Sequence, residues 1–151
     1  MHLDSLTRPE LIFTDLDGYD RSTVLRSLAR RVVAQGVLPE AEELYRKLWE
    51  REQLGSTGIG SGVAIPHCKM DGIAGVILAI GRLTHGIDFG SVDGKPVQLL
   101  FLVISPSHLP AAHLQCLAAI SRWVKVEENV DRVLELSDPQ DVYQFLRVGR
   151  S

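Results

Sequence analysis

Apolar residues recur at helical spacing in the first and last thirds of the chain, whereas the middle third contains two continuous apolar runs. These runs, Ile73–Leu83 and Val97–Ile104, are rich in Val, Ile and Leu, which is typical of central strands covered on both faces. Two shorter runs, Leu11–Phe13 and Val63–Ile65, predict further strands. Asp93-Gly94 is a two-residue hairpin signal just before the second long run.

Helical patterns flank these strands on both sides in sequence. Asp20 or Ser22 is expected to cap a first helix that Gly36 ends, and a second helix is expected to start near Pro39. A third follows Pro106, and two further helical segments complete the chain. The buried face of the third helix is expected to consist of Leu114, Leu117, Ala118, Ser121 and Val124. Helices on both sides of a mostly buried sheet predict an α/β fold, a three-layer α/β/α sandwich with a central mixed sheet.

Length and composition narrow the class of protein. A chain of 151 residues suggests one domain over residues 1–151. A net charge of −3 argues against broad capture of nucleic acid, and two cysteines cannot form a disulfide framework. The longest apolar stretch, Leu99–Ile104, is too short to cross a bilayer, and the N-terminus lacks the pattern of a secretory signal. We therefore expect a cytoplasmic, reduced protein that does not insert directly into a membrane.

The residues that can carry chemistry gather between positions 55 and 69. Four glycines fall within residues 55–62, and such a loop can direct backbone N–H groups at an anion. It is neither a P-loop, because no Gly-Lys-Ser/Thr ends it, nor a dinucleotide fingerprint, because Val63 stands at the third glycine position. His67 follows a predicted strand and a proline, and a neutral imidazole is a nucleophile at pH 7. On these residues alone, the loop can instead be an ordinary flexible connection, and a half-buried structural role is favoured for the histidine.

A longer pattern runs from Arg51 through the glycine-rich stretch to Ala64-Ile65-Pro66-His67 and Lys69. Further matching segments are Ile87–Gly90, Asp93–Val97 and His113–Arg122. The pattern resembles the enzyme IIA domains of the bacterial phosphoenolpyruvate-dependent phosphotransferase system, of the mannitol/fructose type. Within that type, it is most similar to the nitrogen-regulatory branch. The resemblance covers at least residues 20–147.

The resemblance implies a phosphocarrier in which His67 is the phosphorylated nucleophile. It also implies that Arg51 is the cation beside the phosphoryl group and that His113 is a second active-site histidine. Such proteins pass phosphoryl groups between proteins without a nucleotide, metal or other cofactor. The implied donor is an HPr-type phosphocarrier protein, and the implied acceptor is a IIB domain or a regulatory target protein. No residues are left over for a fused IIB domain or permease, which favours the regulatory role over sugar uptake.

Two features beside His67 bear on partners. Ile59, Val63 and Ile65 are expected to form an apolar rim on which a carrier protein docks. Lys69 can add positive potential for a phosphate, or it can be an ordinary solvated lysine.

Other interpretations of the same residues remain open. His67, Cys68, His113 and Cys116 are all potential zinc ligands. Adjacent residues in an extended segment point in opposite directions, however, which argues against His67 and Cys68 binding one ion. A sugar-specific fructose or mannitol IIA component is the second alternative. A phosphate-independent binding module with the same fold is the third.

Overall fold

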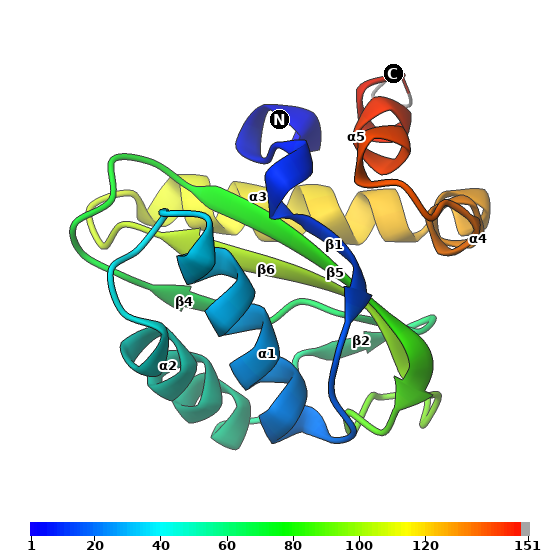
Figure 1. Ribbon diagram of the computed structural model, residues 1–151, viewed down its shortest axis with the longest axis horizontal. Helices are drawn as coiled ribbons and strands as arrows, with labels where there is room; N and C mark the ends of the chain where they lie inside the picture. Colours follow the sequence, from blue (N-terminus) through cyan, green and yellow to red (C-terminus); the bar gives the residue numbers. More distant parts are fainter. Residues whose placement is uncertain (149–151) are drawn as a thin grey trace.

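The computed structural model describes residues 1–148, so the last three residues of the expected 1–151 domain lie outside the described residues. A mixed sheet forms the centre of this described part (Figure 1). Its strands are β1 (Ile12–Leu16), β2 (Gly58–Gly60), β3 (Val63–Ala64), β4 (His67–Lys69), β5 (Ile77–Ile87) and β6 (Val97–Ser105). The strand order is β1-β5-β6-β3-β2, with β4 also paired to β6. The two long strands β5 and β6 are antiparallel, whereas β1 is parallel to β5, and β3 and β4 are parallel to β6.

Helices cover both faces of this sheet. They are α1 (Arg21–Ala34), α2 (Ala41–Gln53), α3 (Pro110–Val124), α4 (Glu127–Glu135) and α5 (Pro139–Val148), with short 3-10 turns η1 (Leu3–Leu6) and η2 (Pro9–Leu11) near the N-terminus. Helices α1 and α2 pack on one face, and α3, α4 and α5 pack on the other (Figure 1). The predicted α/β/α sandwich with a central mixed sheet is therefore confirmed. No helix within residues 1–148 has the length and apolar character needed to cross a bilayer.

Strand β6 explains why the sequence shows a continuous apolar run. Successive side chains of a strand point to opposite faces. Leu100 and Leu102 pack toward α1 and α2, whereas Leu99, Phe101 and Val103 pack toward α3, and all five are fully buried. Both faces need apolar residues because both are covered by helices.

Three of the differences between predicted and observed boundaries have a local cause in the structure. Strand β5 begins at Ile77 and not at Ile73, because the chain bends at Ala74 and Gly75. Helix α2 begins two residues after Pro39, since Glu40 keeps an extended backbone. The β5–β6 connection is longer than a two-residue hairpin, because the Asp93 carboxylate accepts hydrogen bonds from the backbone N–H groups of Ser61 and Lys95 and holds the connection against the β2–β3 turn.

The predicted buried face of α3 is wrong by a rotation of about one residue. The buried residues of this helix are His113, Cys116, Ala119, Ile120 and Val124. Leu114, which was expected to be buried, is 66% exposed. A periodicity argument counts leucines as buried, whereas here a polar histidine faces the sheet because its ring has a hydrogen-bond partner there.

Candidate functional site

Arg51, His67 and His113 come from three separate elements and meet in one hollow of about 680 Å³. Arg51 lies in the last turn of α2, His67 is the first residue of β4, and His113 lies in the first turn of α3. Nε of Arg51 donates a hydrogen bond to Nε2 of His67 at 3.2 Å. The ring centroids of the two histidines are 5.4 Å apart, with 59° between their planes. The three residues singled out from the sequence are thus brought together.

The hydrogen bonds of His67 fix which ring nitrogen carries its proton. Nδ1 lies 2.7 Å from the carbonyl oxygen of Ile65, which can only accept, so Nδ1–H is the donor. Arg51 can only donate, so Nε2 presents its lone pair to the guanidinium. Burial is the main factor that lowers the pKa of His67, and the charge of Arg51 lowers it further. His67 is therefore neutral at pH 7 with a nucleophilic Nε2.

The register of β4 separates His67 from the neighbouring cysteine. His67 pairs with Val103 and Cys68 pairs with Ile104, so His67 is on the α3 side of the sheet and Cys68 is on the α1–α2 side. Cys116 lies in the core on the α3 side. Burial raises the pKa of the Cys68 thiol to about 12 and that of Cys116 to about 11, so both remain protonated. The four ligands of the zinc interpretation do not converge, and no group of three metal-ligating side chains lies together within residues 1–148.

The glycine-rich segment holds Arg51 in place. Nη1 of Arg51 donates to the carbonyl oxygen of Gly55 at 2.8 Å. The adjacent Glu52 is 2% exposed, and its carboxylate accepts hydrogen bonds from the backbone N–H of Thr57 at 2.9 Å and from the Thr57 hydroxyl at 2.6 Å. Nη1 of Arg21 lies 3.7 Å from the same carboxylate. Sequence reasoning missed these contacts of Glu52 with Thr57 and Arg21, here called the Glu52 clamp. Glu52 and Thr57 both lie within the pattern that runs from Arg51 to Lys69.

His113 has a buried partner that sequence reasoning also missed. Its Nδ1 lies 2.6 Å from Oγ of Ser105, the last residue of β6. Ser105 is fully buried and His113 is 6% exposed. Burial lowers the pKa of His113, and repulsion from a protonated His67 ring and from Lys69 lowers it further. The only signal in the sequence was a hydroxyl residue directly after the apolar run.

Comparison with known proteins assigns the chain to a family. The family described as "Phosphoenolpyruvate-dependent sugar phosphotransferase system, EIIA 2" matches residues 5–148. The chain belongs to this family. It is 32% identical over 148 residues to the nitrogen regulatory protein of Pseudomonas aeruginosa, covering 97% of this chain and 95% of that relative. It is also 32% identical over 144 residues to the "PTS system fructose-specific EIIA component" of Haloferax volcanii, covering 95% of this chain and 94% of that relative.

Solved structures of EIIA proteins share its fold. The nitrogen regulatory protein IIA-Ntr of Neisseria meningitidis superposes with a TM-score of 0.87 at 25% identity, covering 95% of this chain and 98% of that one. The mannitol IIA enzyme of Escherichia coli, solved in complex with its phosphorylated IIB enzyme, superposes with a TM-score of 0.76 at 18% identity, covering 96% of this chain and 100% of that one. That complex is an instance of a IIA domain interacting with a IIB domain.

The rim of the EIIA hollow is apolar, but not at the residues expected from the sequence. Val63 and Ile65 are buried in the α3-side core, so the predicted rim of Ile59, Val63 and Ile65 is wrong. Ile59 is exposed but does not line the hollow. The rim instead consists of Leu54, Leu114 and Leu117, and the first two are 84% and 66% exposed.

Positive charge surrounds the same hollow. Lys47 and Lys69 line it with Arg51, and Nζ of Lys47 donates to the backbone carbonyl of Lys69 at 3.2 Å. Glu50 also lines it but forms an ion pair with Arg46 one helical turn earlier. The hollow therefore favours an anion such as a phosphoryl group.

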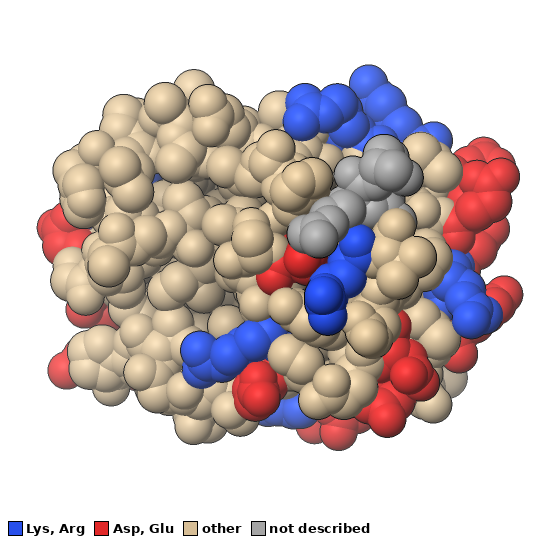
Figure 2. Space-filling view, turned by 90° about the horizontal axis from the view of Figure 1, so that it is seen from above, with Lys and Arg blue, Asp and Glu red and all other residues tan. Residues whose placement is uncertain are grey.

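Charged side chains are sparse where α3 begins. Figure 2 shows that few charged side chains lie on the left half of this view, the end at which α3 starts in Figure 1. The exposed residues over the first nine positions of α3 are Pro110, Ala111, Leu114, Gln115 and Ala118, and none is charged. Charged side chains gather toward α4 and α5.

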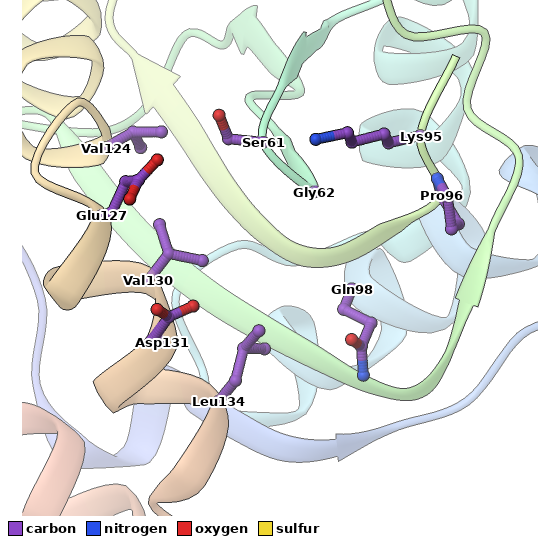
Figure 3. A pocket seen from close by; sticks show the side chains of 10 residues that line it. All are labelled: Ser61, Gly62, Lys95, Pro96, Gln98, Val124, Glu127, Val130, Asp131 and Leu134. Carbon is purple, nitrogen blue, oxygen red and sulfur yellow. The ribbon is translucent and has the colours of Figure 1, made fainter. Parts of the chain in front are cut away.

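A second hollow of about 500 Å³ lies between α4 and the start of β6 (Figure 3). Lys95 reaches into it from one side, and Glu127 and Asp131 face it from α4. It is lined by Ser61, Gly62, Lys95, Pro96, Gln98, Val124, Glu127, Val130, Asp131 and Leu134. Because this lining holds no histidine or cysteine, it offers no nucleophile of the kind found at His67.

Proposed function

We propose that this EIIA chain is a phosphocarrier of the bacterial phosphoenolpyruvate-dependent phosphotransferase system. It accepts a phosphoryl group from an HPr-type protein on Nε2 of His67 and thus acts as a protein-histidine phosphotransferase, with residues 1–151 working as one IIA-type domain in the cytoplasm. One observation carries the choice of atom. Nδ1 of His67 is committed to the carbonyl of Ile65, which leaves Nε2 with a free lone pair beside a guanidinium.

The transfer step needs little covalent chemistry from the protein. The lone pair of Nε2 forms a bond to phosphorus while the bond between phosphorus and the donor's nitrogen breaks, and the electron pair of that bond returns to the donor. His67 keeps its Nδ1–H, which stays bonded to Ile65 throughout. Arg51 leaves Nε2 and donates to the oxygens of the incoming phosphoryl group, a role that suits its planar fork of donors.

The residues around the hollow indicate how a partner protein docks. Leu54, Leu114 and Leu117 offer an apolar patch, and Lys47 and Lys69 add positive charge. A carrier protein that must deliver its phosphoryl group and leave requires a small, transient interface of this kind. The acceptor is a regulatory target protein or a IIB domain.

Two branches of the family are candidates for the pathway. We favour the nitrogen-regulatory branch, because the relatives of Pseudomonas aeruginosa and Neisseria meningitidis carry that name. A sugar-specific IIA component that passes phosphate to a IIB domain is the second candidate, because the fructose-specific relative is equally identical at 32%.

The proposal is tested by phosphorylating the purified protein with phosphoenolpyruvate, enzyme I and an HPr-type carrier, followed by intact mass measurement. The wild-type protein should gain one phosphoryl group, and His67→Ala should gain none while keeping its fold, since His67 is half-buried and lies outside the apolar core. Wild-type protein that gains no phosphoryl group would instead favour a phosphate-independent binding module.

A further inference from the structure

We propose that Ser105 is a positioning residue for phosphoryl transfer, because its hydroxyl donates to Nδ1 of His113 and thereby places the His113 proton on Nε2, where it can bind the phosphoryl group. This inference rests on the proposed function of His67. It assigns a role to a residue that does not line the hollow.

The direction of the Ser105–His113 hydrogen bond follows from the number of donor hydrogens and acceptors that the two side chains have. A neutral imidazole has one N–H donor and one acceptor nitrogen, and a serine hydroxyl can donate or accept. If Nδ1–H donated to Ser105, the hydroxyl hydrogen would need another acceptor. Ser105 is fully buried, and its hydroxyl makes no second hydrogen bond within the part of the chain that the structure describes. A buried donor without a partner is costly, so the hydroxyl donates and Nδ1 accepts.

That direction decides what His113 presents to His67. With Nδ1 occupied by Ser105, Nε2 is the ring nitrogen left for the hollow that His113 lines. The neutral ring then carries its only proton on Nε2. His113 can therefore donate to a phosphoryl oxygen held on His67, whose ring centroid is 5.4 Å away. The other tautomer would point a lone pair at the phosphate and repel it.

The position of Ser105 in the sheet fixes one end of the Ser105–His113 hydrogen bond. It ends β6 and pairs with Lys69 of the strand that begins with His67. Its backbone carbonyl also accepts a hydrogen bond from Met70 at 2.9 Å. The sheet thus fixes Ser105 relative to His67. The hydrogen bond from the Ser105 hydroxyl then fixes the orientation of the His113 ring relative to His67.

The test combines a tautomer measurement with a transfer measurement. Long-range ¹H–¹⁵N NMR of unphosphorylated protein at pH 7.5 should show His113 with its proton on Nε2. In Ser105→Ala that preference should be lost, and transfer from the HPr-type carrier should slow by about 10-fold or more, the size of effect found when the partner that orients a metal-binding histidine is removed. Ser105→Thr keeps a hydroxyl and should recover the wild-type tautomer and most of the rate.

Ser91→Ala is the matched control, because the Ser91 hydroxyl is buried and has no hydrogen-bond partner within residues 1–148. It should leave both readouts unchanged. A wild-type His113 with its proton on Nδ1 overturns the proposal without any variant. In Ser105→Ala the proposal requires both changes, so a changed tautomer with a normal rate, or a slower rate with a normal tautomer, also overturns it. If wild-type protein takes up no phosphoryl group, the proposed function fails, and the tautomer measurement still decides what Ser105 does.

Discussion

Nε of Arg51 donates a hydrogen bond to Nε2 of His67 at 3.2 Å, so the one ring nitrogen with a free lone pair is covered by a guanidinium. The same arginine is held from its other side by the carbonyl of Gly55. The contact of the Arg51 guanidinium with the nucleophilic nitrogen of His67 has two consequences. Together with burial it keeps His67 neutral, and the guanidinium needs only a small movement to reach the oxygens of an arriving phosphoryl group.

Arg51→Lys should slow phosphoryl transfer by about 10²–10³-fold, even though the charge is kept, because lysine cannot reproduce a planar two-point grip. The measurement is a time course of phosphorylation by the HPr-type carrier. Arg46→Lys is the matched control, since Arg46 lies on the same helix but pairs with Glu50. Equal rates for wild type and Arg51→Lys would show that the guanidinium of Arg51 has no specific role in phosphoryl transfer.

The ring of His67 should titrate with a midpoint below its ordinary value of 6.5, because burial and Arg51 both lower its pKa. An NMR titration of the ring measures this directly. Arg51→Gln removes the nearby positive charge and should move the midpoint upward. A wild-type midpoint at or above 6.5 would contradict a buried, neutral His67, and an Arg51→Gln midpoint equal to that of the wild type would show that Arg51 does not act on the ring.

The same pKa shift links stability to pH. Between 6.5 and the lowered pKa of the folded state, the unfolded chain binds more protons than the folded one, so stability falls as the pH falls through this window. His67→Ala removes one such group and should lose less stability between pH 7 and pH 5. Urea denaturation at several pH values checks the difference, and parallel curves for the two proteins would contradict it.

Much of the fold was readable from the sequence because both faces of β6 are apolar and helical stripes flank the strands. Arg51, His67 and His113 came from a family resemblance, since nothing in periodicity brings a helix end, a strand start and a helix start together. Ser105 was missed because one hydroxyl after an apolar run reads as a strand end. The rim was misplaced because Ile65 and Leu114 are both apolar, and only packing shows that the first is buried and the second exposed.

Glu52→Gln should destabilise the fold by about 1–3 kcal/mol, because one of the two hydrogen bonds from Thr57 then meets an amide donor. It should also slow transfer, since the clamp orders the segment that holds Arg51. Urea denaturation and the phosphorylation time course measure the two effects. Glu50→Gln, at an exposed position on the same helix, is the control and should change stability little. Equal stability of the two variants would show that the clamp is not formed.

Leu114→Glu should raise the half-saturating concentration of the HPr-type carrier by about 10-fold, because it places a charge in the apolar rim of the hollow. The rate at saturation should change less. Val92→Glu changes an equally apolar residue that is 93% exposed outside the hollow, and should have no effect. A carrier affinity that Val92→Glu weakens more than Leu114→Glu would place docking on another face.

The most direct test of the account is to locate the phosphoryl group on the ring. NMR of the phosphorylated protein with ¹⁵N-labelled histidine should show phosphorus bonded to Nε2 of His67, with Nδ1 still protonated and bonded to the Ile65 carbonyl. Phosphorylation on Nδ1 of His67, on His113 or on any other residue would contradict the geometry from which the mechanism is derived.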